Sequence, residues 1–191
     1  KYSSGLIALS GCLQGEIPNA LLLGRQDDAE GFLKTYLDIF GAGNFYIELM
    51  DHGMEEQKKV KPLLVQLAKT FHVPIVATND CHYLKKEDRD VHEVLLCIQT
   101  GKTLEDADRM RFGSDEFYFK SPEIMIQSFN YSKEAIDNTV IIAERCNLKL
   151  EFASETGRFF LPHFEIDAEQ TLDEYLHELA SKGLAEMLPA I

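Results

Sequence analysis

The sequence predicts an α/β protein built on a parallel sheet or barrel. Three short apolar runs, at residues 6–9, 45–49 and 75–77, have the composition of strands buried on both faces. A helical pattern follows each run, and this alternation of strand and helix is typical of parallel α/β folds. Each run also ends in polar side chains able to bind metal, at the strand end where ligands bind in such folds.

The helices between these strands are predicted from apolar residues that recur at helical spacing. We expect helices at residues 17–23, 27–40, 55–71 and 87–99. The second has one apolar stripe, which comprises Ala29, Phe32, Leu33, Tyr36, Leu37 and Phe40. The third has another, which comprises Val60, Leu63, Leu64, Leu67 and Ala68. Pro62 lies within this third helix and predicts a kink or an initial turn, because proline has no backbone N–H to donate.

The pattern changes after Gly101. Residues 103–115 are polar and loop-like, and residues 117–119 form a short extended piece. A further helix begins at Ser121, which is a favourable N-cap, with Pro122 at the first helical position.

The last part of the chain is predicted to be helical and irregular. A helix at residues 132–146 is expected to turn inward Ala135, Ile136, Val140, Ile141, Ala143 and Cys146. Thr171 and Glu174 resemble a capping box, which begins a final helix that ends near Met187. We therefore place an α/β body at residues 1–150 and a second unit at residues 151–191.

Composition limits the class of protein. The chain has 191 residues, of which 45% are hydrophobic and 27% charged, as in ordinary globular proteins. No apolar run approaches the roughly 18 residues that span a bilayer, so no membrane association is expected. The net charge of −13 disfavours strong binding of DNA by this segment alone, because DNA binding relies on positive charge.

The cysteines and the chain ends bear on the cellular context. Cys12, Cys81, Cys97 and Cys146 are widely spaced, which argues against a disulfide scaffold or zinc ribbon and favours a reducing cytoplasm. The chain begins at Lys1 without an initiator methionine or a signal-peptide pattern. We interpret it as a piece of a longer cytoplasmic protein.

Asp80 and His82 form the strongest candidate site. They follow the third apolar run, and in an extended segment residues two apart point the same way. A carboxylate oxygen and an imidazole nitrogen that converge in this way are suitable metal ligands. Cys81 should point the other way and be packed rather than ligating. The alternative is an Asp-capped turn beside a surface histidine.

Polar residues after the first two strands could complete this site. Cys12 follows the first run, where it is either a metal ligand or a small buried hydrophobe. Asp51 and His52 follow the second run and form either part of the site or a simple turn. Glu48 alternates with apolar neighbours, so it lies near the site or faces solvent. His92 is interpreted as a residue of a helix surface.

Several segments, taken in order, resemble the PHP (polymerase and histidinol phosphatase) domain of the bacterial C-family replicative DNA polymerases, the polymerase III alpha subunits. The matching segments are residues 9–16 (LSGCLQGE), 45–53 (FYIELMDHG), 77–83 (ATNDCHY), 92–102, 117–123, 138–139 and 142–147. They extend over nearly the whole chain, which makes the resemblance specific.

The resemblance implies a fold and a set of metal ligands. It implies an incomplete, distorted β/α barrel followed by helical segments, with up to three metal ions at the strand ends. Cys12 takes the place of a histidine in phosphoesterase relatives, while Asp80 and His82 match the closing Asp-x-His metal motif. Glu48 and His52 are near-site residues. Residues 151–191 are interpreted as a linker and the start of the polymerase palm.

The resemblance also implies chemistry that residues outside this chain supply. The first metal motif, His-x-His, is expected before Lys1, and the three catalytic aspartates of the palm after Ile191. No residue of this chain is therefore assigned a catalytic role, and the chain alone is expected to be inactive. The implied cofactors are divalent ions, namely Zn, Mn or Mg in the PHP site and Mg at the polymerase site.

Two functions remain open within this resemblance. In the first, the parent protein is a DNA-directed DNA polymerase and this segment supports metal-dependent 3′–5′ exonuclease or phosphoesterase activity. In the second, the segment is a non-catalytic module that stabilises the polymerase and docks a proofreading subunit. An independent histidinol-type phosphatase is disfavoured by residues 117–122 and 138–147.

The implied partners follow from the same resemblance. They are the rest of the polymerase chain, DNA through other domains, and replisome subunits such as a proofreading exonuclease and the sliding clamp. Self-association of the fragment is also expected, because an incomplete barrel exposes strand edges and apolar surface.

Overall fold

The three predicted strands form one parallel sheet, which confirms the α/β fold class, but the first strand is shorter and more exposed than predicted: it comprises only residues 8–9, and Leu6 and Leu9 are exposed. In the computed structural model, β1 (Ala8–Leu9), β2 (Phe45–Leu49) and β3 (Ile75–Ala77) lie in this order, so each strand neighbours the next along the chain. Both strand pairs are parallel. The carboxyl ends of all three strands therefore lie at the same edge of the sheet.

The structure describes residues 2–162, 164–166 and 170–188, and it divides them into two units. Unit 1 extends to Asn147 and unit 2 begins at Leu148. The predicted second unit, 151–191, includes residues 163, 167–169 and 189–191, which lie outside the described residues. The division into a partial PHP domain and a palm segment stays a prediction.

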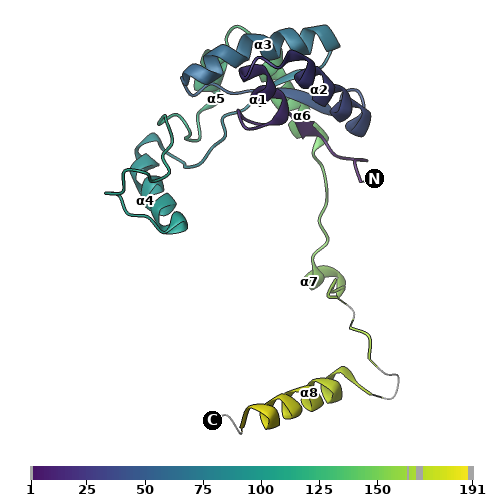
Figure 1. Cartoon of the computed structure of the whole chain (residues 1–191). Helices are drawn as coiled ribbons and strands as arrows, with labels where there is room; N and C mark the ends of the chain where they lie inside the picture. The colour runs from purple at the N-terminus through teal and green to yellow at the C-terminus, as the bar shows by residue number, and fades with distance from the viewer. Residues whose placement is uncertain (1, 163, 167–169, 189–191) are drawn as a thin grey trace. The chain divides into compact units, whose positions relative to one another are not determined.

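Unit 1 contains helices that connect the strands and others that follow β3 (Figure 1). They are α1 (Glu16–Leu22), α2 (Gln26–Phe40), α3 (Glu55–Phe71), the short 3-10 helix η1 (Lys86–Asp88), α4 (Arg89–Thr100), α5 (Pro122–Ser128) and α6 (Lys133–Arg145). Unit 2 contains α7 (Ala153–Thr156) and α8 (Leu172–Met187). None of the helices in the described ranges is long and apolar enough to cross a membrane.

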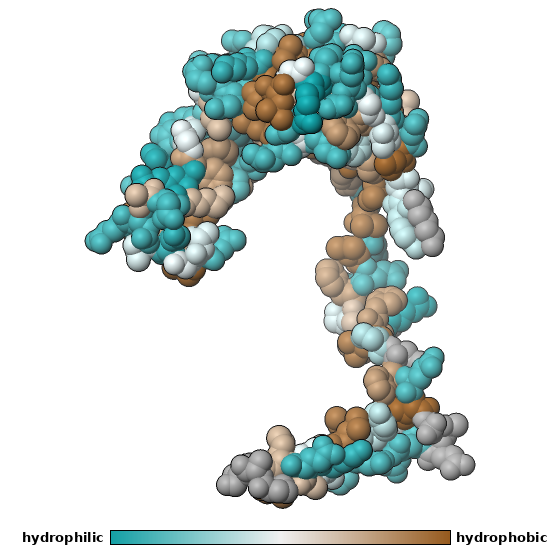
Figure 2. Space-filling model, in the orientation of Figure 1, coloured by the Kyte–Doolittle hydropathy of each residue, from teal (hydrophilic) through white to brown (hydrophobic). Residues whose placement is uncertain are grey.

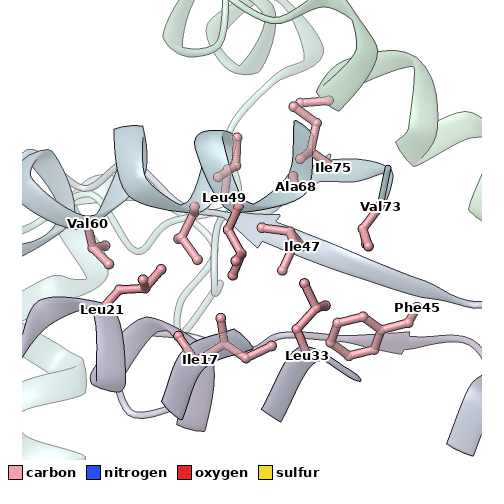
Figure 3. Packing of buried hydrophobic residues seen from close by; sticks show 14 of the residues in the cluster. Ile17, Leu21, Leu33, Phe45, Ile47, Leu49, Val60, Ala68, Val73 and Ile75 are labelled. Carbon is pink, nitrogen blue, oxygen red and sulfur yellow. The ribbon is translucent and has the colours of Figure 1, made fainter. Parts of the chain in front are cut away.

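The core lies between β2 and the helices α1, α2 and α3. Figure 3 shows apolar side chains of β2 between those of α1 and α2 on one side and those of α3 on the other. The central members are Ile17, Leu21, Leu33, Phe45, Ile47, Leu49, Val60, Leu64 and Ala68, all nearly inaccessible to solvent. All five residues of β2 are buried, as expected for the middle strand of a covered parallel sheet.

Helix α6 covers β3 through one buried polar contact. The side-chain amide of Asn138 donates a hydrogen bond to the backbone oxygen of Ile75 at 2.7 Å. Ala135 is fully buried on the same helix. The prediction that Val140, Ile141, Ala143 and Cys146 face inward is wrong, because all of them are exposed. Val140 and Ile141 lie on a different side of α6 from Ala135 and Asn138, and Cys146 follows the last helical residue.

Two predictions for α3 are also corrected. Leu63 is 41% exposed rather than buried, because it lies at the edge of the apolar stripe of α3. Pro62 does not begin the helix but lies inside it, and the helix extends unbroken from Glu55 to Phe71. Burial of Val60, Leu64 and Leu67 offsets the backbone hydrogen bond that a proline cannot donate.

The capping predictions are confirmed. Ser121 accepts a hydrogen bond from the amide of Ile124 and caps α5, with Pro122 in its first turn. Thr171 and Glu174 form a reciprocal capping box at the start of α8. In unit 2, the irregular segment before α8 exposes apolar side chains, seen in brown in Figure 2, among them Leu148, Phe152 and Phe160.

Candidate functional site

Glu48 connects the carboxyl ends of all three strands. Its carboxylate accepts one hydrogen bond from the amide of Gly11 at 3.0 Å and another from the hydroxyl of Thr78 at 2.5 Å. Its own amide donates to the hydroxyl of Ser10 at 2.9 Å. The side chain is buried, so the alternative that Glu48 faces solvent is wrong. Its carboxylate instead fixes the loops that follow β1 and β3.

Asp80 and His82 lie side by side just beyond β3. The Oδ1 atom of Asp80 is 3.3 Å from the Nε2 atom of His82, and both side chains are about one-third exposed. The two polar groups therefore converge at one accessible point, as their spacing predicts. The extended backbone on which this prediction relied is absent, because Asp80 has a φ of +44° in the left-handed region.

The same turn corrects the prediction for Cys81. The thiol is exposed rather than packed, and its Sγ atom lies 3.6 Å from the backbone oxygen of Tyr118. Alternation of side chains holds only in an extended strand, and β3 ends at Ala77. The left-handed residue Asp80 turns the chain and brings Cys81 to the surface.

Cys12 lies in a shallow pocket after β1. The pocket is lined by Gly11, Cys12, Leu13, Pro18, Glu48, Leu49, Met50, Gln57, Val60, Lys61 and Leu64. Cys12 and Glu48 therefore line one pocket, and neither Asp80 nor His82 is among its lining residues. Within the residues described, the structure holds no group of three or more His, Cys, Asp or Glu side chains that could bind a metal ion. The role of Cys12 as a ligand therefore stays a prediction.

His52 is buried, and both of its ring nitrogens are engaged. Nε2 lies 2.9 Å from the backbone oxygen of Asn79, and Nδ1 lies 2.8 Å from the side-chain nitrogen of Gln57. Burial lowers the pKa of His52, since the charged ring would lose its hydration. The ring also stacks on Phe117, with centroids 3.9 Å apart.

Asp51 is paired with a lysine beside the same strand end. Its Oδ2 atom is 2.5 Å from the Nζ atom of Lys61, and its Oδ1 atom accepts from the amide of Gly53. Burial would raise the pKa of Asp51, but the hydrogen bonds from Lys61 and Gly53 outweigh it and the pKa is lowered. Asp51 is thus a paired carboxylate directed toward α3.

Aromatic rings flank His82. The rings of Phe112 and His92 lie 4.6 Å and 5.5 Å from that of His82, centroid to centroid. His92 projects from α4 and is partly buried, with its pKa lowered first by burial and then by the neighbouring His82. It therefore lies close to the candidate site, whereas the sequence indicated only a position on a helix surface.

Residues 114–120 contact the strand-end residues of the site and were not predicted as part of it. The side-chain amide of Asn79 donates hydrogen bonds to the backbone oxygens of Glu116 and Tyr118, at 3.1 Å and 2.6 Å. The buried Lys120 forms an ion pair with Glu116 at 3.0 Å. Gln57 was also missed, although a polar residue in the apolar stripe of α3 is a detectable signal.

Comparison with known proteins first defines the class of domain. Residues 1–52 match the model of the PHP domain. This segment contains β1, β2 and their strand-end residues Cys12, Glu48 and His52.

The similarity to one particular subunit extends over the chain. It is 43% identical over 185 residues, or 96% of its length, to the DNA polymerase III subunit alpha of Treponema pallidum. It is 44% identical over 192 residues, or 99%, to that of Thermus aquaticus. The chain spans 16% of the length of both relatives. The resemblance to the polymerase III alpha subunits is therefore confirmed.

Proposed function

We propose that the chain is a segment of a replicative DNA polymerase in which Asp80 and His82 hold a divalent metal ion. This site supports hydrolysis of phosphoesters, in the form of a 3′–5′ exonuclease. The observation that carries the proposal is the 3.3 Å separation of the Asp80 carboxylate and the His82 ring at the end of β3. Similarity to the polymerase III alpha subunits supplies the context.

The Asp80–His82 pair fits a metal ion. Two ligand atoms that each lie about 2.1 Å from one ion are separated by roughly 3.0–3.4 Å in octahedral or tetrahedral geometry. The observed 3.3 Å falls in this range. A carboxylate and an imidazole can bind Zn, Mn or Mg, whereas thiolate ligands are more selective among these metals. The pair is also accessible, as an ion exchanging with solvent requires.

The neighbouring polar residues have different proposed roles. Cys12 lines a pocket with Glu48 that includes neither Asp80 nor His82, so we propose it as a candidate ligand beside this pair, with a thiolate that would favour Zn over Mg. Glu48 accepts hydrogen bonds at both carboxylate oxygens and holds the loops in place. His52 is excluded as a ligand, because both ring nitrogens already have partners inside the protein.

A bound ion would supply a hydroxide nucleophile and neutralise charge on the phosphoryl group. The residues of this chain contribute binding and orientation. Asp80 provides negative charge, and His82 must be deprotonated at Nε2 to offer its lone pair. The hydrogen bond of 2.8 Å from the backbone amide of His82 to the backbone oxygen of Phe117 anchors the backbone that carries the ring.

A structural module is the second candidate function. It is favoured by contacts that fasten residues 114–120 to the strand ends without using a metal: His52 stacks on Phe117, Asn79 donates to Tyr118, and Lys120 donates to Asp51. In this alternative the segment supports the polymerase and docks a proofreading subunit. The remaining partners in either case are the rest of the alpha chain, DNA bound through other domains with Mg at the polymerase centre, and the sliding clamp.

A nuclease assay distinguishes the two functions. The full-length polymerase subunit would be incubated with a 3′-labelled single-stranded oligonucleotide and Mn²⁺, as unmodified protein and as Asp80→Asn and His82→Ala. The exonuclease proposal expects release of labelled nucleotide that falls at least 100-fold in both variants. The matched controls Asp173→Asn and His177→Ala, both exposed on α8, should retain full activity. Activity that persists in both site variants would contradict the proposal.

A further inference from the structure

The protonation pattern of His52 follows from its hydrogen bonds. The amide of His52 donates to the Oε1 atom of Gln57 at 2.7 Å, which orients the Gln57 side chain so that its nitrogen faces the ring. That nitrogen can only donate, so Nδ1 of His52 accepts from it at 2.8 Å. The oxygen of Asn79 can only accept, so Nε2 carries the hydrogen and donates to it at 2.9 Å.

This hydrogen bond ends on the peptide that leads into Asp80. Asp80 adopts a φ of +44°, in the left-handed region that is uncommon for residues with a side chain, although aspartate enters it more readily than most. His52 is buried, with an exposed fraction of 2%. A buried donor that fixes the carbonyl of Asn79 therefore restrains the orientation of the next residue.

The face of the His52 ring contacts the residue that anchors His82. The ring of His52 stacks on Phe117 with an interplanar angle of 23°. The backbone oxygen of Phe117 in turn accepts the hydrogen bond from the amide of His82 at 2.8 Å. One side chain from the end of β2 thus contacts both the peptide that precedes Asp80 and the residue that anchors His82.

We infer that His52, held in one tautomer by Gln57, is a positioning residue that fixes Asp80 and His82 at the separation a metal ion requires. The inference rests on the proposed metal site but concerns a residue that does not touch the ion. Outer partners that orient metal ligands typically contribute about 10- to 100-fold in metal affinity.

Binding of Mn²⁺ measures this role directly. The full-length subunit would be titrated with Mn²⁺, and electron paramagnetic resonance would measure the free ion. The binding site that is lost in Asp80→Asn is the proposed site. His52→Gln, which retains a donor but not the ring, is expected to weaken that site by about 10-fold or more. His177→Gln makes the same replacement at an exposed position on α8 and should leave the affinity unchanged.

A second variant separates positioning from folding. Gln57→Met removes both hydrogen bonds to His52 while leaving the ring and its stacking partner in place. We expect Gln57→Met to bind Mn²⁺ more weakly at a temperature well below the melting midpoint of each variant. A purely structural role of Gln57 would not weaken binding while the protein is folded. Unchanged affinity in both His52→Gln and Gln57→Met would overturn the inference. Absence of any Asp80-dependent site in the unmodified protein would instead refute the proposed function.

Discussion

The carboxylate of Glu48 accepts a hydrogen bond from the hydroxyl of Thr78 at 2.5 Å, and its other oxygen accepts from the amide of Gly11 at 3.0 Å. A single side chain on the middle strand thus joins the loops after its two neighbours. Cys12 directly follows Gly11, and Asp80 lies two residues after Thr78, so both metal-capable residues are next to this connection in sequence.

Replacing Glu48 by glutamine should destabilise unit 1. The amide group can accept at one atom only, so either Gly11 or Thr78 loses its acceptor, at a cost of about 1–3 kcal/mol. Urea unfolding followed by circular dichroism, in the presence of a chelator, would measure the loss. The control Glu144→Gln changes an exposed carboxylate on α6 and should shift stability by less than about 0.5 kcal/mol. Equal stability of the two variants would contradict this account of Glu48.

The buried ring of His52 should make folding sensitive to mild acid. Burial lowers its pKa below the value of about 6.5 expected in the unfolded chain. The unfolded state therefore binds more protons than the folded state below about pH 6.5. The contribution of neutral His52 to the free energy of unfolding is fully present above this pH and is lost as the pH falls below it. Urea midpoints between about pH 7.5 and pH 5.5 should fall less steeply in His52→Gln than in the unmodified chain. Parallel slopes would show that His52 is not buried as a neutral ring.

Asn138 should contribute to stability through its contact with β3. Asn138→Ala leaves the backbone oxygen of Ile75 without the donor now 2.7 Å away, which should cost about 1–3 kcal/mol. The same replacement at the exposed Asn147 is the control and should have little effect. Thermal unfolding by differential scanning calorimetry compares them. A variant of Asn138 as stable as that of Asn147 would mean that α6 does not depend on this bond.

Self-association of the 191-residue chain stays a prediction that the surface of α4 makes testable. Val91, Val94, Leu95 and Ile98 form an apolar stripe at helical spacing and are 63%, 41%, 57% and 72% exposed. Contiguous exposed apolar surface promotes association. Light scattering should detect dimers of the unmodified chain, and Leu95→Glu should weaken them. Gln99→Glu is the control, because it makes the same change of charge beside the stripe and should leave the dimers intact. A monomer at all concentrations would contradict the prediction.

Much of the fold could be predicted because its pattern is local. The limits of β2, α3 and β3 match those expected, since short apolar runs and helical periodicity directly encode strands and helices buried against a core. Helix α6 shows where this reasoning fails. Its apolar residues, including Val140 and Ile141, recur often enough to predict a helix, but only the contacts of α6 with β3 decide which side is buried.

The site was predictable only in part, for a related reason. The spacing of Asp80 and His82 correctly placed them together, but contacts distant in sequence set the turn between them. Asn79 binds the backbone of Glu116 and Tyr118, and these contacts accompany the left-handed backbone that exposes Cys81. No single stretch of sequence contains that information.

The central claim, that Asp80 and His82 hold a metal ion, is tested most directly by diffraction. Crystals of the full-length subunit soaked in Mn²⁺ would be measured at the manganese absorption edge. The account predicts an anomalous peak about 2.1 Å from both Asp80 Oδ1 and His82 Nε2, absent in Asp80→Asn crystals. A fully soaked crystal with manganese bound elsewhere but no peak between these two atoms would contradict it.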